Sequence, residues 1–198
     1  HEIPDHKKAT YIRTCADYRE QKADPYRVRC TAGGNLIDFP GDKSTRSADL
    51  TTFKCLANLT VSTPGARAAC MDLKDLYLKS TLPDPEYVRF RIDLITQHIW
   101  EQYNLQEYAN EDGYIYARLE KGMYGLPQAG KVANDQLLPR LAVAGYHETG
   151  VTPGLFKHES NSIIFCLVVD DFFIQYTDLE DLHHLTNTLR KDYDLTLD

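Results

Sequence analysis

The chain of 198 residues lacks the features of several protein classes. No apolar run reaches the roughly 18 residues of a membrane-spanning helix, so we expect no membrane partner. No secretory signal peptide opens the sequence. The five cysteines, at 15, 30, 55, 70 and 166, are scattered and form no C-x-x-C pair, which argues against a disulfide scaffold and a structural zinc site. These absences favour an intracellular globular protein of one domain or two small ones. The first residue is His1 rather than Met, so we expect a piece of a longer polypeptide.

Basic charge is also scarce. The chain has 22 basic and 29 acidic residues, a net charge of −7. Residues 1–50 hold nine basic and eight acidic side chains, which leaves 13 and 21 for residues 51–198. Phosphate binding usually leaves a basic footprint, so a nucleic-acid contact is expected in the N-terminal part, with a solvated charged face as the alternative. The basic residues concerned are Lys7, Lys8, Arg13, Arg19, Lys22, Arg27 and Arg29.

Two adjacent aspartates interrupt an apolar stretch near the C-terminus. The runs 162–169 and 172–176 are rich in β-branched and aromatic residues, and Asp170 and Asp171 lie between them. This pattern predicts a β-hairpin with the acidic pair at its turn. Carboxylates among apolar neighbours are costly to leave unpaired, which indicates a divalent cation. An ordinary solvated turn is the alternative.

Two further segments stand out. Residues 68–73 form an apolar run that carries one acid, which predicts a buried strand ending at Asp72. Residues 121–130 contain three glycines and a proline, so they predict a constrained loop, and a helical pattern follows over about 127–144.

The remaining periodicity predicts an α+β fold. Strands are expected over 10–18, 26–32, 87–92 and 113–119, and helices over about 49–61, 95–103 and 179–189. Ser47 or Asp49 is expected to cap the first helix, whose apolar stripe is Leu50, Phe53, Leu56 and Leu59. Pro139 is expected to kink the helix over 127–144. The order strand, helix, two-stranded hairpin, helix favours a ferredoxin-like antiparallel sheet with packed helices.

Three blocks of the sequence together resemble one family. Asp72 opens a D-x-K-x-x-Y-L block, Tyr124 opens a Y-G-L-x-Q-A block, and Val169 opens V-D-D, in this order and about 50 residues apart at each step. Over about Thr10 to Asp198 the chain is similar to the reverse transcriptases of copia-type retrotransposons. The resemblance implies a polymerase palm, mainly within 51–198, and a fingers subdomain from 1–50 with 79–120. The thumb and the ribonuclease H segment would lie outside the chain.

The resemblance also implies a metal site for nucleotidyl transfer. Asp72 and Asp170 would be the principal ligands of two Mg²⁺ ions, or of Mn²⁺, with Asp171 as the accessory acid. The Leu73 carbonyl would complete one shell. Hard oxygen ligands suit these cations, and phosphoryl transfer depends mostly on positioning and charge neutralisation.

The same resemblance implies several contacts to the incoming nucleotide. The finger strand would grip the triphosphate through Arg27 or Arg29, and the planar fork of donors of arginine suits that task. The backbone at Asp75 and Leu76 would lie near the triphosphate. Tyr77 would exclude a ribose 2′-hydroxyl, with a core tyrosine as the alternative. Gln128 would lie against the nucleotide, with a surface glutamine as the alternative.

One position departs from the family pattern. Most relatives have an aromatic residue two positions before the paired acids, where this chain has Val168. The resemblance places Val168 and Val169 near the primer end, so the departure bears on primer positioning rather than on metal binding.

The expected function is that of an RNA-directed DNA polymerase cut from a retrotransposon polyprotein. Its partners would be an RNA or DNA template with its primer, deoxynucleoside triphosphates, and the thumb, ribonuclease H and integrase domains of the same polyprotein. It would act in the cytoplasm or in a virus-like particle. One alternative is a degenerate or domesticated fragment that only binds nucleic acid or protein. Another is a palm enzyme such as a nucleotide cyclase, which the Gln128 block and the finger arginines disfavour.

Overall fold

The computed structural model describes residues 3–21 and 25–198, so Lys22 of the expected basic set lies outside the described residues. The chain forms two compact units. Unit 1 comprises His1–Asp42 and Ser80–Ala129, and unit 2 comprises Lys43–Lys79 and Gly130–Asp198. The sequence had placed the divisions at 50, 79 and 120. The chain therefore leaves unit 1 twice: it forms the first part of unit 2, returns to unit 1, and then completes unit 2.

Unit 1 is built on a four-stranded sheet with the order β2-β1-β4-β5. Its strands are β1 (Thr10–Tyr18), β2 (Tyr26–Ala32), β4 (Thr81–Arg91) and β5 (Tyr114–Lys121). Its helices are α3 (Gln97–Tyr103) and the short 3₁₀ turns η1 (Gly34–Leu36), η2 (Ile92–Leu94) and η3 (Leu105–Tyr108). The expected strands at 10–18 and 26–32 are confirmed. The later two strands are longer than their alternating patterns indicated.

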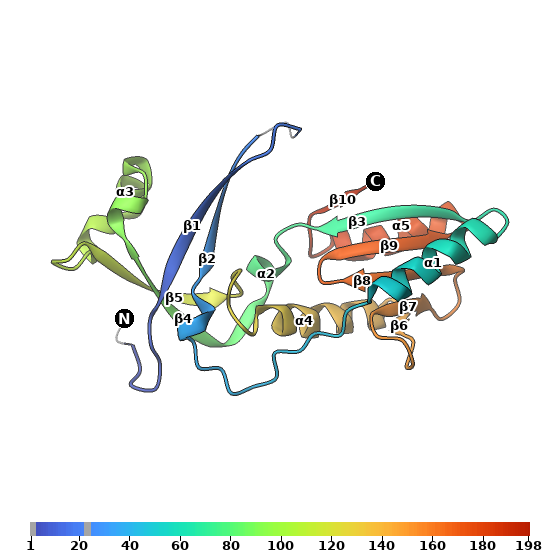
Figure 1. Ribbon diagram of the computed structural model, residues 1–198, viewed down its shortest axis with the longest axis horizontal. Helices are drawn as coiled ribbons and strands as arrows, with labels where there is room; N and C mark the ends of the chain where they lie inside the picture. Colours follow the sequence, from blue (N-terminus) through green and yellow to red (C-terminus); the bar gives the residue numbers. More distant parts are fainter. Residues whose placement is uncertain (1–2, 22–24) are drawn as a thin grey trace. The chain divides into compact units, whose positions relative to one another are not determined.

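Unit 2 contains a six-stranded sheet with the order β10-β3-β9-β8-β7-β6, in which all neighbouring strands are antiparallel. Its strands are β3 (Arg67–Leu73), β6 (Tyr146–Glu148), β7 (Leu155–His158), β8 (Ile163–Val168), β9 (Asp171–Tyr176) and β10 (Leu195–Leu197). Its helices are α1 (Leu50–Ser62), α2 (Leu76–Lys79), α4 (Ala129–Val143, whose first residue belongs to unit 1) and α5 (Leu179–Arg190). Figure 1 shows β3, β9 and β8 running side by side within this unit.

The core of unit 2 lies on one face of its sheet. Along each central strand alternate residues are buried, because successive side chains point to opposite faces. The buried rows pack with apolar residues of α4 and α5, including Leu137, Leu141 and Leu185, all 0% exposed. The succession β3, α4, β8, β9, α5, β10 is the β-α-β-β-α-β order of a ferredoxin-like fold. The expected α+β class is therefore confirmed.

The opposite face of this sheet is covered in part by α1. Asp49 caps this helix by accepting a hydrogen bond from the Thr52 N–H at 2.7 Å. The predicted apolar stripe is wrong for two members, since Leu50 and Leu59 are 66% and 45% exposed while Leu56 packs beneath the helix. One helix cannot cover a six-stranded sheet, so the end of this face near the β8–β9 turn stays open.

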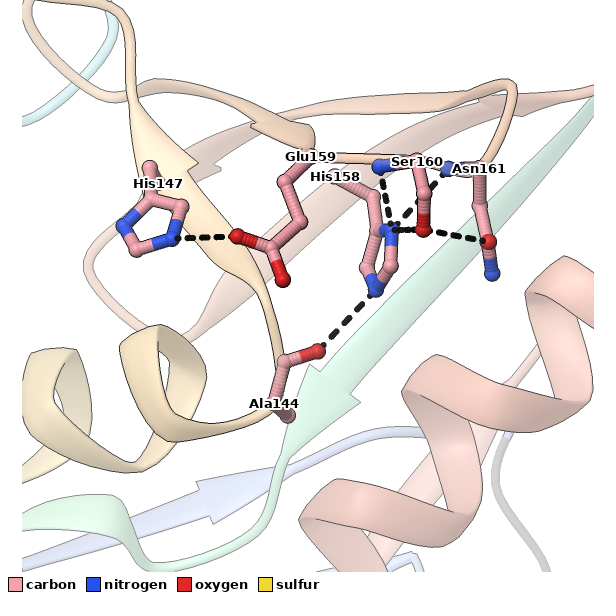
Figure 2. Close-up of polar contacts among 6 residues, drawn as sticks. All are labelled: Ala144, His147, His158, Glu159, Ser160 and Asn161. Atoms are coloured by element: carbon pink, nitrogen blue, oxygen red, sulfur yellow. Dashed lines mark hydrogen bonds and ion pairs between the residues drawn. The ribbon is translucent and has the colours of Figure 1, made fainter.

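The turn between β7 and β8 is held by a histidine (Figure 2). His158 Nδ1 accepts from the backbone N–H groups of Ser160 and Asn161 at 3.1 and 3.0 Å. The hydrogen of the neutral ring is therefore on Nε2, which donates to the Ala144 carbonyl at 3.0 Å. This pair of interactions ties the turn to the segment that precedes β6.

Several other expectations can be compared with the structure. The short strands β6, β7 and β10 were missed, and Pro139 lies inside α4, which continues to Val143. All five cysteines are free thiols, as expected for a chain without a disulfide scaffold. Within the described part of the chain, no helix is both long and apolar enough to cross a membrane.

Candidate functional site

The two adjacent aspartates lie where the sequence predicted them, at the turn of a hairpin. β8 ends at Val168 and β9 begins at Asp171, so Val169 and Asp170 form a two-residue connection. Val169 has φ +61°, which is rare for a β-branched residue. Among the described residues, φ is positive at Val169 and not at Asp170. The turn therefore has the φ pattern of type II′, in which the first central residue has positive φ and is usually glycine. Such a backbone costs of order 1–3 kcal/mol and persists because the paired strands on either side hold it.

Asp72 lies on the strand next to this hairpin. β3 pairs with β9 so that Asp72 is directly opposite Asp171, and the Leu73 N–H donates to the Asp170 carbonyl at 3.0 Å. Directly opposite residues project from the same face of a sheet. The register therefore brings Asp72 beside Asp171, while Asp170 follows in the turn. The sequence assigns the main metal-binding role to Asp72 and Asp170, and this assignment stays a prediction.

The pairing extends this contact into a row across four strands. Thr196 of β10 is opposite Asp72, and Val168 of β8 is opposite Asp171. Asp171 and Val168 are exposed, and Asp72 is half-buried. On the other face Met71, Leu73 and Phe172 are buried in the core. The carboxylates thus stand on a backbone that the core makes rigid.

A second row of residues lies on the same face of the sheet, two positions further along the strands, and completes a pocket. Cys70 and Cys166 are both opposite Phe173, and Asp198 exchanges two backbone hydrogen bonds of 2.9 Å with Cys70. Phe53 of α1 packs edge-on against Phe173 with ring centroids 4.8 Å apart. The two rows line a pocket of about 260 Å³ with a carboxylate end and an aromatic and thiol end. Burial raises the pKa of the Cys166 thiol, which favours its neutral form.

The donor set of this site suits a cation only in part. In residues 3–21 and 25–198, no three side chains of His, Cys, Asp or Glu lie close enough to hold a metal ion by themselves. Mg²⁺ is usually held by one or two carboxylates together with substrate phosphates and water. Asp72 and Asp171 on one face fit that pattern, provided that a substrate supplies the remaining oxygens.

The segment after β3 carries three of the expected nucleotide contacts. Asp75 has φ +54° and its carbonyl accepts the Lys79 N–H at 3.1 Å, which closes the turn of α2. The Leu76 side chain is buried in the core of unit 2, so only its backbone is available to a ligand. Tyr77 is half-buried and packs against the same core, which keeps both of its readings open.

The two finger arginines share one face of β2, as their spacing predicted. Arg27 is opposite Asp17 and Arg29 is opposite Cys15 on β1. Arg27 is half-buried and Arg29 is exposed. Asp17 is exposed, and its carboxyl pKa is lowered mainly by a hydrogen bond from Arg19, with a smaller contribution from the charge of Arg29. A basic pair on an exposed strand is able to hold an anion.

Gln128 does not lie on the surface. Its side chain is 2% exposed, and its Nε2 donates to Glu86 Oε1 at 2.8 Å. The loop before it is fixed by Gly125, which has φ +93° and where a Cβ would collide with the Ala32 carbonyl oxygen. The surface reading of Gln128 is therefore wrong, while its expected contact to a nucleotide stays a prediction.

Sequence reasoning missed several residues at these places. Thr196 and Asp198 belong to a strand that was not predicted, and Cys70 lies two residues before Asp72 on the same face. The alternation along β3 could have indicated Cys70. Glu86 is distant in sequence from Gln128, and no local pattern links the two.

Two comparisons with known proteins bear on the chain. A family model described as "Reverse transcriptase (RNA-dependent DNA polymerase)" matches residues 18–197. Among solved structures, telomerase from Candida albicans in complex with a TWJ fragment of telomeric RNA is similar at 11% identity with a TM-score of 0.48. That match covers 99% of this chain and 43% of the telomerase chain, so this chain spans less than half the length of that neighbour.

Proposed function

Because the chain belongs to the reverse transcriptase (RNA-dependent DNA polymerase) family, we propose that it carries the palm and fingers of an RNA-directed DNA polymerase from a copia-type retrotransposon. The observation that carries this proposal is the register of β3 and β9, which pairs Asp72 with Asp171 beside the Asp170 turn. Unit 2 would be the palm and unit 1 the fingers.

Asp72, Asp170 and Asp171 would hold Mg²⁺ or Mn²⁺ together with the phosphate oxygens of a substrate, and the Leu73 carbonyl is a further candidate ligand. The bound ions would activate the primer 3′-hydroxyl and stabilise the leaving pyrophosphate. The role of this chain would be to hold the three carboxylates at the end of the unit 2 sheet near the β8–β9 turn. Their accessible side chains and rigid backbone support that role.

The remaining residues would position the nucleotide and the primer. Arg27 and Arg29 would bind the triphosphate through charge-assisted hydrogen bonds. The backbone at Asp75 and Leu76 would lie near the same phosphates, and the Tyr77 ring would discriminate against a ribose 2′-hydroxyl. Val168, which lies in the row of Asp72 and Asp171, and Val169, which lies in the turn, would be near the primer end.

The partners would be an RNA or DNA template with its primer and deoxynucleoside triphosphates. A net charge of −7 gives the chain little attraction for a duplex, so the thumb and ribonuclease H domains of a polyprotein would supply much of the grip. Integrase would be a further domain of the same polyprotein. The place of action would be the cytoplasm or a virus-like particle.

A thermal-shift titration tests the proposal on the chain itself. A deoxynucleoside triphosphate with Mg²⁺ or Mn²⁺ should stabilise the wild type, by roughly 2.7 kcal/mol at 100 times the Kd, or about 5–10 °C. Asp72→Asn and Asp171→Asn should remove most of that shift, because each takes away a charged ligand. Glu111→Gln, which removes an exposed carboxylate of unit 1, should keep it.

Primer extension on an annealed template gives the second readout. Incorporation should disappear in Asp72→Asn and persist in Glu111→Gln. Equal shifts in all four proteins would place the nucleotide elsewhere. No shift in any of them would contradict the polymerase and favour a chain that serves only as an interaction module.

A further inference from the structure

The Gln128 side chain is held in one orientation and has an unused acceptor. Its Nε2 donates to Glu86 Oε1 at 2.8 Å, and both side chains are buried, at 2% and 3% exposed. In the described part of the chain, Gln128 Oε1 has no hydrogen-bond partner and is closed to solvent. Buried polar atoms without partners are uncommon in folded proteins, and each one requires a physical explanation.

The hydrogen-bonding capacity of the two side chains fixes the orientation of the Gln128 amide. A glutamine amide has a donor end and an acceptor end, whereas an ionised carboxylate only accepts. Glu86 must therefore face the Nε2 of Gln128, and the carbonyl oxygen must face away from Glu86. The amide cannot turn over without placing two acceptors against each other.

Lys7 completes this arrangement. Its Nζ lies 3.2 Å from Glu86 Oε1 and 2.7 Å from Asp84 Oδ2. Burial acts to lower the pKa of the Lys7 ammonium, but the hydrogen bonds and charges of Asp84 and Glu86 outweigh it, so the pKa is raised above its usual value. The lysine stays charged and pairs with the buried carboxylate that holds the amide.

From these contacts we infer that Lys7 and Glu86 are positioning residues, which act through Gln128 to present its Oε1 as an acceptor for a hydroxyl or amino donor of a bound nucleotide. This inference rests on the proposed function. Because Oε1 is closed to solvent in this structure, the inference requires a local opening around Gln128 when the nucleotide binds. Because the Gln128 amide is already held in one orientation, binding costs less side-chain entropy than it would for a freely rotating glutamine.

Asp84 offers a matched control for Glu86. Both carboxylates form an ion pair with Lys7, but the Asp84 side chain is 69% exposed, and it is Glu86 that accepts the hydrogen bond from Gln128. Glu86→Gln and Asp84→Asn each remove one negative charge next to the same lysine. In Glu86→Gln the new amide is able to pair with either end of Gln128, so the orientation of Gln128 becomes mixed. In Asp84→Asn it does not change.

The experiment measures the Kd of a deoxynucleoside triphosphate with Mg²⁺ for the 198-residue chain and its variants. Glu86→Gln should weaken binding about tenfold, the net worth of one hydrogen bond, and Asp84→Asn should leave it within about twofold of the wild type. In primer extension the same change should raise KM more than it lowers kcat. By NMR, the Gln128 side-chain NH₂ protons should exchange slowly in the wild type and in Asp84→Asn, and faster in Glu86→Gln.

A further variant covers the case in which Glu86→Gln does not fold. The double substitution Lys7→Met with Glu86→Gln leaves no unpaired buried charge, because the remaining carboxylate of Asp84 is 69% exposed. It still frees the amide, so it should show the same tenfold loss. Equal Kd values in all folded variants would overturn the inference and leave the proposed function standing. A loss of binding that only follows loss of stability would make the contacts purely structural and would also overturn it. Absence of nucleotide binding by the wild type would remove both.

Discussion

The two units are stabilised in different ways. Most of the largest fully buried side chains belong to unit 2, among them Tyr146, Phe165 and Phe172, whereas Val88 represents unit 1 in that set. Unit 1 has fewer large buried side chains, and its buried polar groups include a charged one. Thr10 Oγ1 donates to the Gly33 carbonyl at 2.5 Å, and Glu86 is the charged member of the buried set within the described residues.

The stability of the two units is therefore expected to depend on different kinds of substitution. Apolar cores lose stability when a cavity forms, in proportion to the volume removed. Polar contacts lose stability when one partner is left without the other. The carboxylates of the candidate site stand on unit 2, whose core is apolar, and the Gln128 amide, which Glu86 holds in one orientation, belongs to unit 1. The candidate site residues are thus held by apolar packing in one unit and by a polar contact in the other.

The largest expected effect is a cavity in unit 2. Phe165→Ala should destabilise this unit by about 3–5 kcal/mol, because the ring is fully buried and stacks on Phe156 at 5.1 Å. Hydrogen exchange should show lost protection in β8 and β9. Val28→Ala on the exposed hairpin of unit 1, where the side chain is 65% exposed, should change stability by less than about 0.5 kcal/mol. Comparable losses in both variants would contradict the contrast between the units.

A smaller effect is expected at the close backbone contact of unit 1. Gly125→Ala should cost about 2 kcal/mol, since the new Cβ meets the Ala32 carbonyl and φ is +93°. Gly65→Ala in unit 2 is a matched control, because φ is +77° there and nothing lies within 4 Å of the added atom. Urea unfolding curves would give both values. If the two substitutions cost the same, the contact with Ala32 contributes nothing beyond the backbone conformation.

The smallest effect concerns alkaline pH. The pKa of Lys7 is raised in the folded chain, so its contribution is fully present below its usual value near pH 10.4 and is lost as pH rises through the raised value. The free energy of unfolding should therefore fall between about pH 9 and 11.5 more steeply in the wild type than in Lys7→Met, by about 1 kcal/mol or less.

Buried tyrosines also lower the free energy of unfolding as pH rises. Their contribution cancels when the wild type is compared with Lys7→Met. Burial raises the pKa of Tyr146 and of Tyr193, with the charge of Asp181 adding to the shift at Tyr146, and both variants retain these residues. Parallel pH curves for the wild type and Lys7→Met would show that the lysine stabilises the folded chain no more than the unfolded one.

Local patterns predicted most of the elements. Continuous apolar runs located β3, β8 and β9, alternation located β4 and β5, and the 3.6-residue stripe located α5, because burial leaves these signatures in the sequence. The short strands β6, β7 and β10 have three or four residues each, too few for a period to be recognised. The exposure of Leu50 and Leu59 was missed because a stripe does not show what covers it.

Three sequence blocks predict Asp72, Asp170 and Asp171 as site residues, and their roles stay predictions. What the sequence did not predict is how two of them pair. That Asp171 rather than Asp170 is opposite Asp72 follows from the register of β3 against β9, which depends on residues about 100 positions apart. Burial of Gln128 depends likewise on Glu86, 42 residues away. Such contacts belong to the folded chain and leave no local trace.

The two-residue connection at Val169 and Asp170 limits how this segment can diverge. A strand has a side-chain period of two, so one residue inserted or deleted there would shift β9 by one position against its neighbours. Phe172 and Ile174 would then turn outwards, and Asp171 would leave the face that it shares with Asp72. Replacement of Val169 by glycine relieves strain and preserves the spacing. We therefore expect lineages of this chain to vary in residue type at the tip of the hairpin and to conserve its length.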